Sequence, residues 1–381
     1  MGEEARFIRL GSWQLQPRVE LSESYDSNVY ATPSQEEDDF ITRLTPTVRL
    51  QSDWSVHQVV LEAGADLGWY QDFSDEDYQD YYLRNSNRIE VLRGNNILTD
   101  VILRHGHEAR SSPNDIGLSE EPLPYDDVRG SLGYEHSIGV VSLLVDVAAE
   151  RVTYGDTDAI GGGTLDNSYY DRDVREGGIK LTYAREQTSQ AYFSARLIET
   201  DYDDSTLGGR ADRDSSGYNL ALGIKKNLSD IWVLDAYVGY SPRSFSDSSL
   251  EDISGADAIA FGAKALWNPT RLTSVIGNFD RTTYETTEAG ASLMVHTMFA
   301  LRAEHKLTES LVVDANLGYA FDDYVGSDRE DDIYTFGLGA AYYFTKLFSV
   351  RAGYNYFERS SSLDFDDYTK HLATVQFRVN Y

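Results

Sequence analysis

An alternation of apolar and polar residues with a period of two runs through almost the whole chain and is clearest in residues 369–381. Successive side chains of a β-strand point to opposite faces, so such a segment predicts a strand with one apolar and one largely polar face. A chain made of such strands is either a soluble sheet protein or a membrane barrel. The apolar face consists of Ala373, Val375, Phe377, Val379 and Tyr381, and the opposite face consists of Leu372, Thr374, Gln376, Arg378 and Asn380.

The same alternation predicts eighteen strands along the chain. Most are near the length that a tilted membrane strand needs, about 9–11 residues in the hydrocarbon plus an overhang. The predicted strands are 13–25, 40–51, 57–71, 78–93, 97–109, 125–137, 139–154, 168–184, 190–203, 214–227, 230–244, 256–267, 271–284, 291–306, 310–323, 332–344, 347–359 and 367–381.

The connections between these strands alternate in length. Short ones, such as residues 94–96 and 345–346, are separated by longer and mostly acidic ones, such as residues 26–39 and 110–124. Short periplasmic turns and long extracellular loops are typical of outer-membrane barrels, whereas a soluble sandwich has no reason to sort its connections in this way. We therefore predict an all-β fold, a transmembrane antiparallel outer-membrane β-barrel of about 18 strands with short periplasmic turns and long acidic extracellular loops.

The two ends of the chain fit this fold. Residues 1–12 are predicted to form a periplasmic N-terminal leader and residues 13–381 the barrel. Met1-Gly2-Glu3-Glu4 lacks the regions of a signal peptide. Because a barrel must cross the inner membrane, we expect a mature form with a replaced start. The last strand, which ends on an aromatic residue, resembles the segment of outer-membrane barrels that the barrel assembly machinery is thought to read.

Composition excludes several classes of protein. The chain has no cysteine, so disulfides, cysteine–zinc clusters and a thiol nucleophile are excluded. A net charge of -30 argues against a nucleic-acid partner, which needs a basic surface. No apolar run reaches the length of a membrane helix, which is compatible with a barrel because only alternate residues of its strands face lipid. The acidic loops are expected to meet anionic lipopolysaccharide through divalent ions.

The predicted inward face is polar and charged, and its bases and tyrosines are candidate solute contacts in a hydrated bore. Arginine forks suit carboxylates, and tyrosine rings suit sugar rings. The alternative is a ladder in which these bases only pair with acids on neighbouring strands. The predicted pore-lining residues are Arg18, Arg49, Arg84, Arg88, Arg104, Arg129, Arg196, Arg302, Arg351, Arg378, Tyr70, Tyr192 and Tyr237.

Catalytic and metal-binding patterns are scarce. Neither GxSxG nor HExxH occurs, and we predict no catalytic residue, no cofactor and no metal site. His105 and His107 share one face of a predicted strand, but the sequence indicates no third ligand. A hydrolase whose Ser, His and Asp come from different strands remains an alternative.

Two features fit the strand pattern poorly. Pro17 and Pro46 lie inside predicted strands, where proline cannot donate to the ladder, so we predict β-bulges there. Asn85 and Asn87 share a face with Leu83 and Ile89, which leaves the register of strand 78–93 in doubt.

A series of short motifs occupies the first ninety residues. These motifs are Pro17-Arg-Val-Glu-Leu, Tyr25-Asp-Ser-Asn-Val-Tyr30, Thr45-Pro-Thr-Val-Arg-Leu50 and His57-Gln-Val-Val-Leu61. The series resembles the putative beta-barrel porin type two family of outer-membrane proteins. Members of that family occur with exopolysaccharide synthesis and export systems. There the barrel is thought to form the outer-membrane exit and to work with a periplasmic polysaccharide-export protein.

Barrel pattern and resemblance together give one functional prediction. We predict a non-enzymatic channel in the bacterial outer membrane that lets exopolysaccharide leave passively through a hydrated, arginine-rich lumen. Its implied partners are the outer membrane with its lipopolysaccharide, the polysaccharide, the periplasmic export protein and the barrel assembly machinery. The alternatives are a diffusion porin for small anionic or sugar solutes, an outer-membrane enzyme, and a structural barrel with a plugged lumen.

Overall fold

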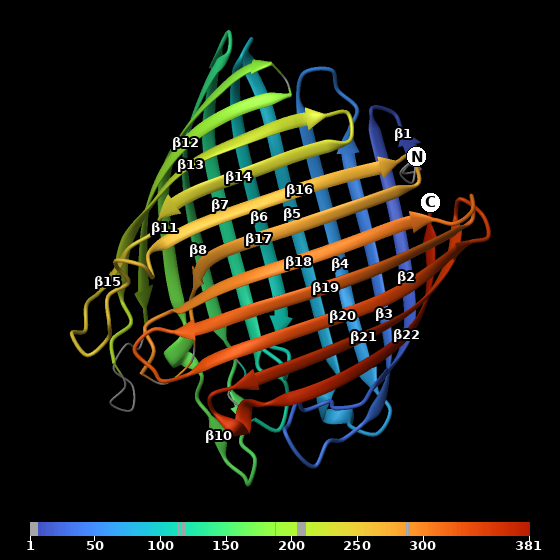
Figure 1. Cartoon of the computed structure of the whole chain (residues 1–381), viewed down its shortest axis with the longest axis vertical. Coiled ribbons are helices and arrows are strands. Elements are labelled where there is room, and N and C mark those ends of the chain that lie inside the picture. The colour runs from blue at the N-terminus through green and yellow to red at the C-terminus, as the bar shows by residue number, and fades with distance from the viewer. Residues whose placement is uncertain are drawn as a thin grey trace.

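The structure is a computed structural model that describes residues 7–381 except 113, 114, 116, 118, 187, 204–210, 287 and 289. Its long strands form an 18-stranded antiparallel barrel (Figure 1). The wall strands are β2 (Trp13–Asp26), β3 (Asp39–Ser52), β4 (Gln58–Tyr70), β5 (Tyr78–Leu92), β6 (Asn95–His107), β7 (Pro124–Ile138), β8 (Val141–Tyr154), β11 (Arg172–Glu186), β12 (Ser189–Tyr202), β13 (Ser215–Ser229), β14 (Trp232–Tyr240), β16 (Ile259–Thr270), β17 (Thr273–Tyr284), β18 (Met294–Lys306), β19 (Leu311–Tyr324), β20 (Glu330–Tyr343), β21 (Phe348–Ser361) and β22 (Tyr368–Asn380).

Pairing between the first and last wall strands closes the barrel. β2 and β22 run antiparallel from the pair Arg18 and Asn380 to the pair Asp26 and Leu372. Closure leaves the wall without a free strand edge, which is the condition for a sheet in hydrocarbon. The predicted strand number is confirmed, and the strand ends agree with the predicted ranges to within a few residues.

Several short elements accompany the wall. β15 (Arg243–Phe245) continues the path of β14 along β13 in the same register, after an interruption at Pro242. Among the described residues no helix is long and apolar enough to cross a membrane. The other short elements are β1 (Ile8–Leu10), β9 (Thr157–Asp158), β10 (Thr164–Leu165) and the 3-10 helices η1 (Ser74–Glu76), η2 (Ser168–Tyr170) and η4 (Asp364–Asp366).

The prediction of bulges at the two prolines is wrong. Pro17 pairs with Val48, and Pro46 pairs with Val19, in an unshifted register. The carbonyl of Pro17 accepts a hydrogen bond from the Tyr381 amide at 3.1 Å, where β22 ends. The ladder between β3 and β4 omits Pro46 and its neighbour Thr45 and then resumes in the same register. The strands therefore tolerate the missing N–H group of each proline without a β-bulge.

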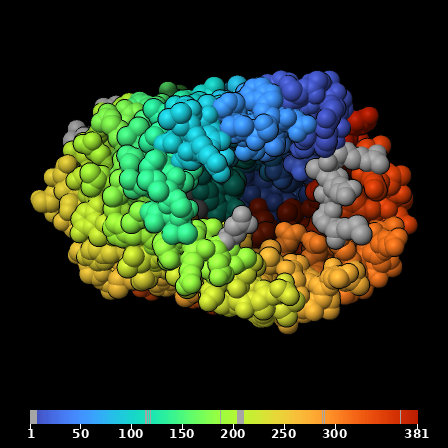
Figure 2. Space-filling model, turned by 90° about the horizontal axis from the view of Figure 1, so that it is seen from above, coloured from blue at the N-terminus to red at the C-terminus, as the bar shows by residue number. Residues whose placement is uncertain are grey.

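The two ends of the barrel differ, as the alternating connection lengths predict. The first and last wall strands, β2 and β22, respectively begin and end at the short-turn end (Figure 1). Of the predicted leader, residues 1–6 lie outside the described residues, while β1 pairs with the start of β2. The predicted loop at 204–213 also lies largely outside them. Seen from the short-turn end, the wall is an oval ring around a hollow (Figure 2).

Apolar side chains cover the outer surface. On β13, Leu222 keeps 61% of its surface exposed, and on β20 Leu338 keeps 50%. Such exposure is costly in water and ordinary in lipid. Alternation along the predicted strand 291–306 would place Leu293 and Val295 on the outward face, but they are not exposed to lipid: both are almost fully buried in a cluster with Ile253.

The asparagines of β5 do share the outward face with Leu83, so the register read from the sequence holds there. The Asn87 amide donates to Asn85 Oδ1 at 2.6 Å and to Thr99 Oγ1 at 2.9 Å. The Asn85 amide donates to the carbonyl of Val60 at 3.1 Å. These bonds partner the polar atoms with protein groups, which reduces the cost of placing them toward lipid.

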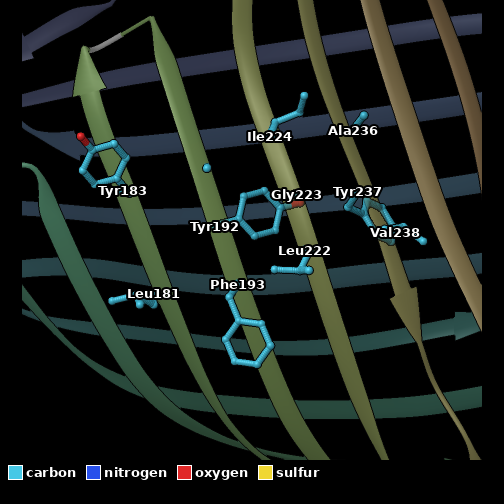
Figure 3. A pocket seen from close by; sticks show the side chains of 11 residues that line it. Leu181, Tyr183, Tyr192, Phe193, Leu222, Gly223, Ile224, Ala236, Tyr237 and Val238 are labelled. Atoms are coloured by element: carbon cyan, nitrogen blue, oxygen red, sulfur yellow. The ribbon is translucent and has the colours of Figure 1, made fainter.

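Glycines on the inner wall make room for tyrosine rings. A Cβ atom built on Gly262 would lie 2.2 Å from the Tyr237 ring and 2.8 Å from Asp280 Oδ2. Gly223 holds the Tyr192 ring in the same way, with a built Cβ at 2.2 Å (Figure 3). A side chain at either glycine would have to displace a ring from the wall.

Replacing Gly262 with valine should therefore destabilise the barrel. Overpacking of a filled site costs about 1–3 kcal/mol, so we expect a lower midpoint of urea unfolding in detergent. Gly177→Val is the control, because a Cβ built on Gly177 meets no atom within 4 Å. Equal midpoints for the two variants would contradict the packing role of Gly262.

Candidate solute path

The predicted pore-lining residues lie on the inner face of the wall. Val128 and Leu132 of β7 are exposed on the lipid side, and Arg129 between them therefore points inward. The same alternation places the other predicted arginines, Tyr192 and Tyr237 inward on their strands. Tyr70 also lies on the inward face, but at the long-loop end of β4, apart from the other two tyrosines.

Eight of the ten predicted arginines form ion pairs with acids of the wall. The acids come mostly from neighbouring strands, as the ladder alternative requires. The pairs are Arg18–Glu20 (3.5 Å), Arg49–Glu62 (3.0 Å), Arg84–Asp100 (2.9 Å), Arg129–Glu150 (2.6 Å), Arg196–Asp146 (2.5 Å), Arg302–Asp314 (3.9 Å), Arg351–Asp314 and Arg378–Glu20 (2.9 Å).

Several bases of the inner wall have no such partner. In the part of the chain that the structure describes, no carboxylate lies within ion-pair distance of Arg88, Arg104 or Lys180. The Lys180 ammonium instead lies 4.3 Å from the centre of the Tyr192 ring, a cation–π contact that leaves its charge unneutralised. Each of these bases keeps a positive charge on the inner wall that no carboxylate neutralises by direct contact.

Glu176 of β11 joins two arginines in the middle of the wall. Its Oε2 accepts hydrogen bonds from Arg129 and from Arg196, each at 3.0 Å. Arg129 also contacts Glu150, and Arg196 also contacts Asp146. The carboxylate therefore sets how much positive charge faces the lumen here, because each arginine keeps one acid if Glu176 is lost.

Tyrosine and glycine alternate in one row across four strands. Gly223 of β13 pairs with Tyr192 of β12 on one side and with Tyr237 of β14 on the other. Tyr237 in turn pairs with Gly262 of β16, over which its ring lies. The Tyr237 hydroxyl donates to Asp280 at 3.0 Å. Figure 3 shows the Tyr192 ring beside Gly223.

A hollow near this row lies on the other side of the wall. Its volume is about 530 Å³, and exposed outward side chains such as Leu181, Phe193 and Leu222 line most of it (Figure 3). Because this side faces lipid, the hollow does not belong to a solute path.

Contacts at the long-loop end reach across the interior, and the sequence reading missed them. The Tyr202 hydroxyl of β12 donates to Glu285, just after β17, at 2.9 Å. Arg359 of β21 donates to the carbonyl of Ser111 at 2.5 Å, although the two residues are 248 positions apart. Val152 and Tyr154, on the inner face of β8, are buried against Leu123 and other loop residues. Loops thus fold inward and narrow this end.

Ion pairs hold the same loops together. Arg110 contacts Glu76 at 2.6 Å and Asp115 at 3.7 Å. Burial raises the pKa of the Asp115 carboxyl to about 6. Arg329 contacts Asp331 and Glu288, each at 2.8 Å, and Asp366 at 3.1 Å. No periodicity marks these residues in the sequence, because they lie in or next to loops.

Sequence reasoning also missed the wall arginine Arg43. Arg43 of β3 forms an ion pair with Asp66 of β4. The signal was present, since Arg43 has the same parity as Arg49 and so lies on the inward face.

The two histidines of the predicted strand 97–109 contact different groups. His105 lies 2.9 Å from Asp126 and stacks on Tyr81. His107 lies 2.9 Å from Asp80, and its ring is 4.3 Å from that of Tyr78. Within the described ranges, no group of three or more His, Cys, Asp or Glu residues is placed to hold a metal ion.

A closed wall with apolar residues outside and charges inside defines an outer-membrane β-barrel channel. The chain belongs to the family described as Putative beta-barrel porin 2, which matches residues 4–381. The predicted family, fold and outer-membrane location are confirmed.

Solved structures of the same fold have low sequence identity to this chain. OpdK of Pseudomonas aeruginosa has a TM-score of 0.51 and 12% identity, with 96% of this chain and 99% of that chain covered. OccAB3 of Acinetobacter baumannii has a TM-score of 0.51 and 11% identity, with 98% and 100% covered. OccK2 of Pseudomonas aeruginosa in complex with glucuronate has a TM-score of 0.51 and 12% identity, with 97% and 99% covered. No curated protein matches the chain.

Neutralising Glu176 should raise the preference of the lumen for anions. In Glu176→Gln one negative charge is lost while both arginines stay paired, so we expect the anion-to-cation permeability ratio to rise roughly twofold. The measurement is the reversal potential in a KCl gradient across a planar bilayer. We also expect a loss of about 1–2 kcal/mol in stability, small because the partners are partly exposed.

The matched control is Glu199→Gln. Glu199 lies on the outward face of β12 and its side chain is 59% exposed. The same loss of charge there should leave selectivity unchanged and stability within about 0.5 kcal/mol. Equal changes in selectivity for both variants would contradict the central position assigned to Glu176.

Proposed function

We propose that this barrel is a passive channel that carries small anionic solutes, including carboxylated sugars, across the outer membrane. The observation that carries the proposal is a set of bases on the inner wall, Arg88, Arg104 and Lys180, for which no ion pair is found among the described residues. Charges of one sign in a water-filled cleft concentrate solutes of the opposite sign and increase their rate of entry. The hollow at the short-turn end supports a hydrated entrance (Figure 2).

Two barrels of the same fold indicate which solutes to test first. OccK2 of Pseudomonas aeruginosa is known in complex with glucuronate, and OpdK of that organism with vanillate. Both compounds carry a carboxylate. At 12% identity these proteins share only their fold with this chain, so the argument for an anion rests on the charges of its own wall.

Export of exopolysaccharide is the second candidate, and it follows from the family resemblance. The row of Tyr192 and Tyr237 favours it, since rings on the lumen wall suit the faces of sugar rings. The contacts between Tyr202 and Glu285 and between Arg359 and Ser111 weigh against it, because they lie across the end through which a polymer would leave. A periplasmic export protein that opens this end would be part of that hypothesis.

Removing the unpaired arginines should reduce anion selectivity. For the double variant Arg88→Gln, Arg104→Gln we expect the anion-to-cation permeability ratio to fall roughly twofold or more, because two positive charges that form no ion pair are lost from the inner wall. The control is the same substitution at Arg185, an exposed residue near the short-turn end of β11. Reversal potentials in a KCl gradient give the ratio.

The same planar-bilayer experiment distinguishes the two candidate functions. For the small-solute channel we expect glucuronate to carry current, and an acidic polysaccharide added on the short-turn side to leave the open-channel conductance unchanged. One-sided block by the polymer would favour export. A cation-selective pore, or one whose selectivity does not respond to the double variant, would overturn the proposal.

A further inference from the structure

A second hollow near the tyrosine row opens to the lumen. Its volume is about 340 Å³, and it spans the inner wall from β8 to β17. The volume is within the range of small-molecule sites, about 300–1,000 Å³. Its polar lining includes Lys180, Arg196, Asn219, Tyr237, Ser241 and Thr282.

The charges of this cavity do not cancel. Its charged lining residues are Lys180, Arg196 and Asp146. Arg196 forms ion pairs with Asp146 at 2.5 Å and with Glu176 at 3.0 Å. Lys180 pairs across the sheet with Leu144 and Ser194, so neither neighbouring strand places an acid opposite it. The cavity thus presents one ammonium group whose natural partner is the carboxylate of a solute.

Neutral hydrogen-bonding groups lie beside this charge. The Ser241 hydroxyl donates to Oδ1 of Asn219, which orients the amide. Within the described chain no protein group accepts from the amide nitrogen of Asn219, so its N–H donors remain for a ligand. The Thr282 and Ser194 hydroxyls complete a lining that both donates and accepts. Such a lining suits hydroxyl groups, which do the same.

We infer that this cavity is a binding site for a monosaccharide acid, with Lys180 holding the carboxylate and Asn219 and its neighbours holding the hydroxyls. The inference rests on the proposed small-anion channel and adds a saturable site within it. A weak site of this kind gives selectivity among anions while still letting the solute leave. The Tyr192 ring positions Lys180, because its face holds the ammonium without neutralising it.

The test is block of single-channel current by D-glucuronate, with the full chain in a planar bilayer. We expect block that saturates with concentration, while glucose, which lacks the carboxylate, and butyrate, which lacks the hydroxyls, give no saturating block. Lys180→Met should weaken glucuronate binding roughly tenfold, the usual effect of losing one charge-assisted hydrogen bond. In Asn219→Leu, we expect the block by glucuronate to become as weak and non-saturating as the block by butyrate.

Lys225→Met is the matched control. Lys225 lies on the inner face of β13, opposite Asp235 and outside the cavity, so its loss removes the same charge from the lumen. We expect unchanged glucuronate binding in this variant. The mobility of each variant with and without heating in gel electrophoresis shows that it has folded.

Two results would overturn the inference. Block that never saturates would show that glucuronate passes without a site, and equal weakening by Lys180→Met and Lys225→Met would show that only the overall charge matters. In either case the reversal potentials of the Arg88 and Arg104 double variant still decide whether the barrel is an anion channel.

Discussion

Backbone hydrogen bonding between β2 and β22 is the constraint on which the rest of this structure depends. In hydrocarbon no water satisfies a free N–H or C=O group, so a sheet in a membrane must close. Here residues 372–380 at one end of the chain pair with residues 18–26 at the other. Closure divides space into an outside and an inside, and the period-two alternation then assigns each residue to lipid or to the lumen.

The content of the inner wall follows from that division. Charged residues cannot face lipid at low cost, so they gather inside, where ion pairs between neighbouring strands hold most of them. A wall in which all charges cancelled would have little preference among solutes. Here some bases have no ion pair and one carboxylate is shared by two arginines, and one of the unpaired bases, Lys180, lies against the row in which tyrosine rings lie over glycines. The rings are flat against the wall, which keeps the lumen open at that level.

The two ends of the barrel are built differently. At one end, tight turns only reverse the direction of the chain between neighbouring strands. Long loops at the other end fold inward, bury apolar residues such as Leu123 and Tyr154, and tie distant strands together through Arg359 and Ser111. In the small-anion channel proposed above, the narrowed end would select solutes by size, while the charged wall would select them by sign. That proposal therefore involves small acids and not a polymer.

Strand number, strand ends and the two faces of each strand are readable from the sequence, because alternation is a local property of neighbouring residues. The family was also visible, in short motifs of the first ninety residues. Partners were not. Arg196 and Asp146 are 50 positions apart, and their contact depends on the strand register around the barrel. Val295 has the pattern of a lipid-facing residue, yet a cluster with Ile253 covers it. Contacts between residues far apart in the chain decide which charges of the lumen are paired, how the loops fold inward and where the cavity beside Lys180 forms. No local sequence pattern encodes such contacts.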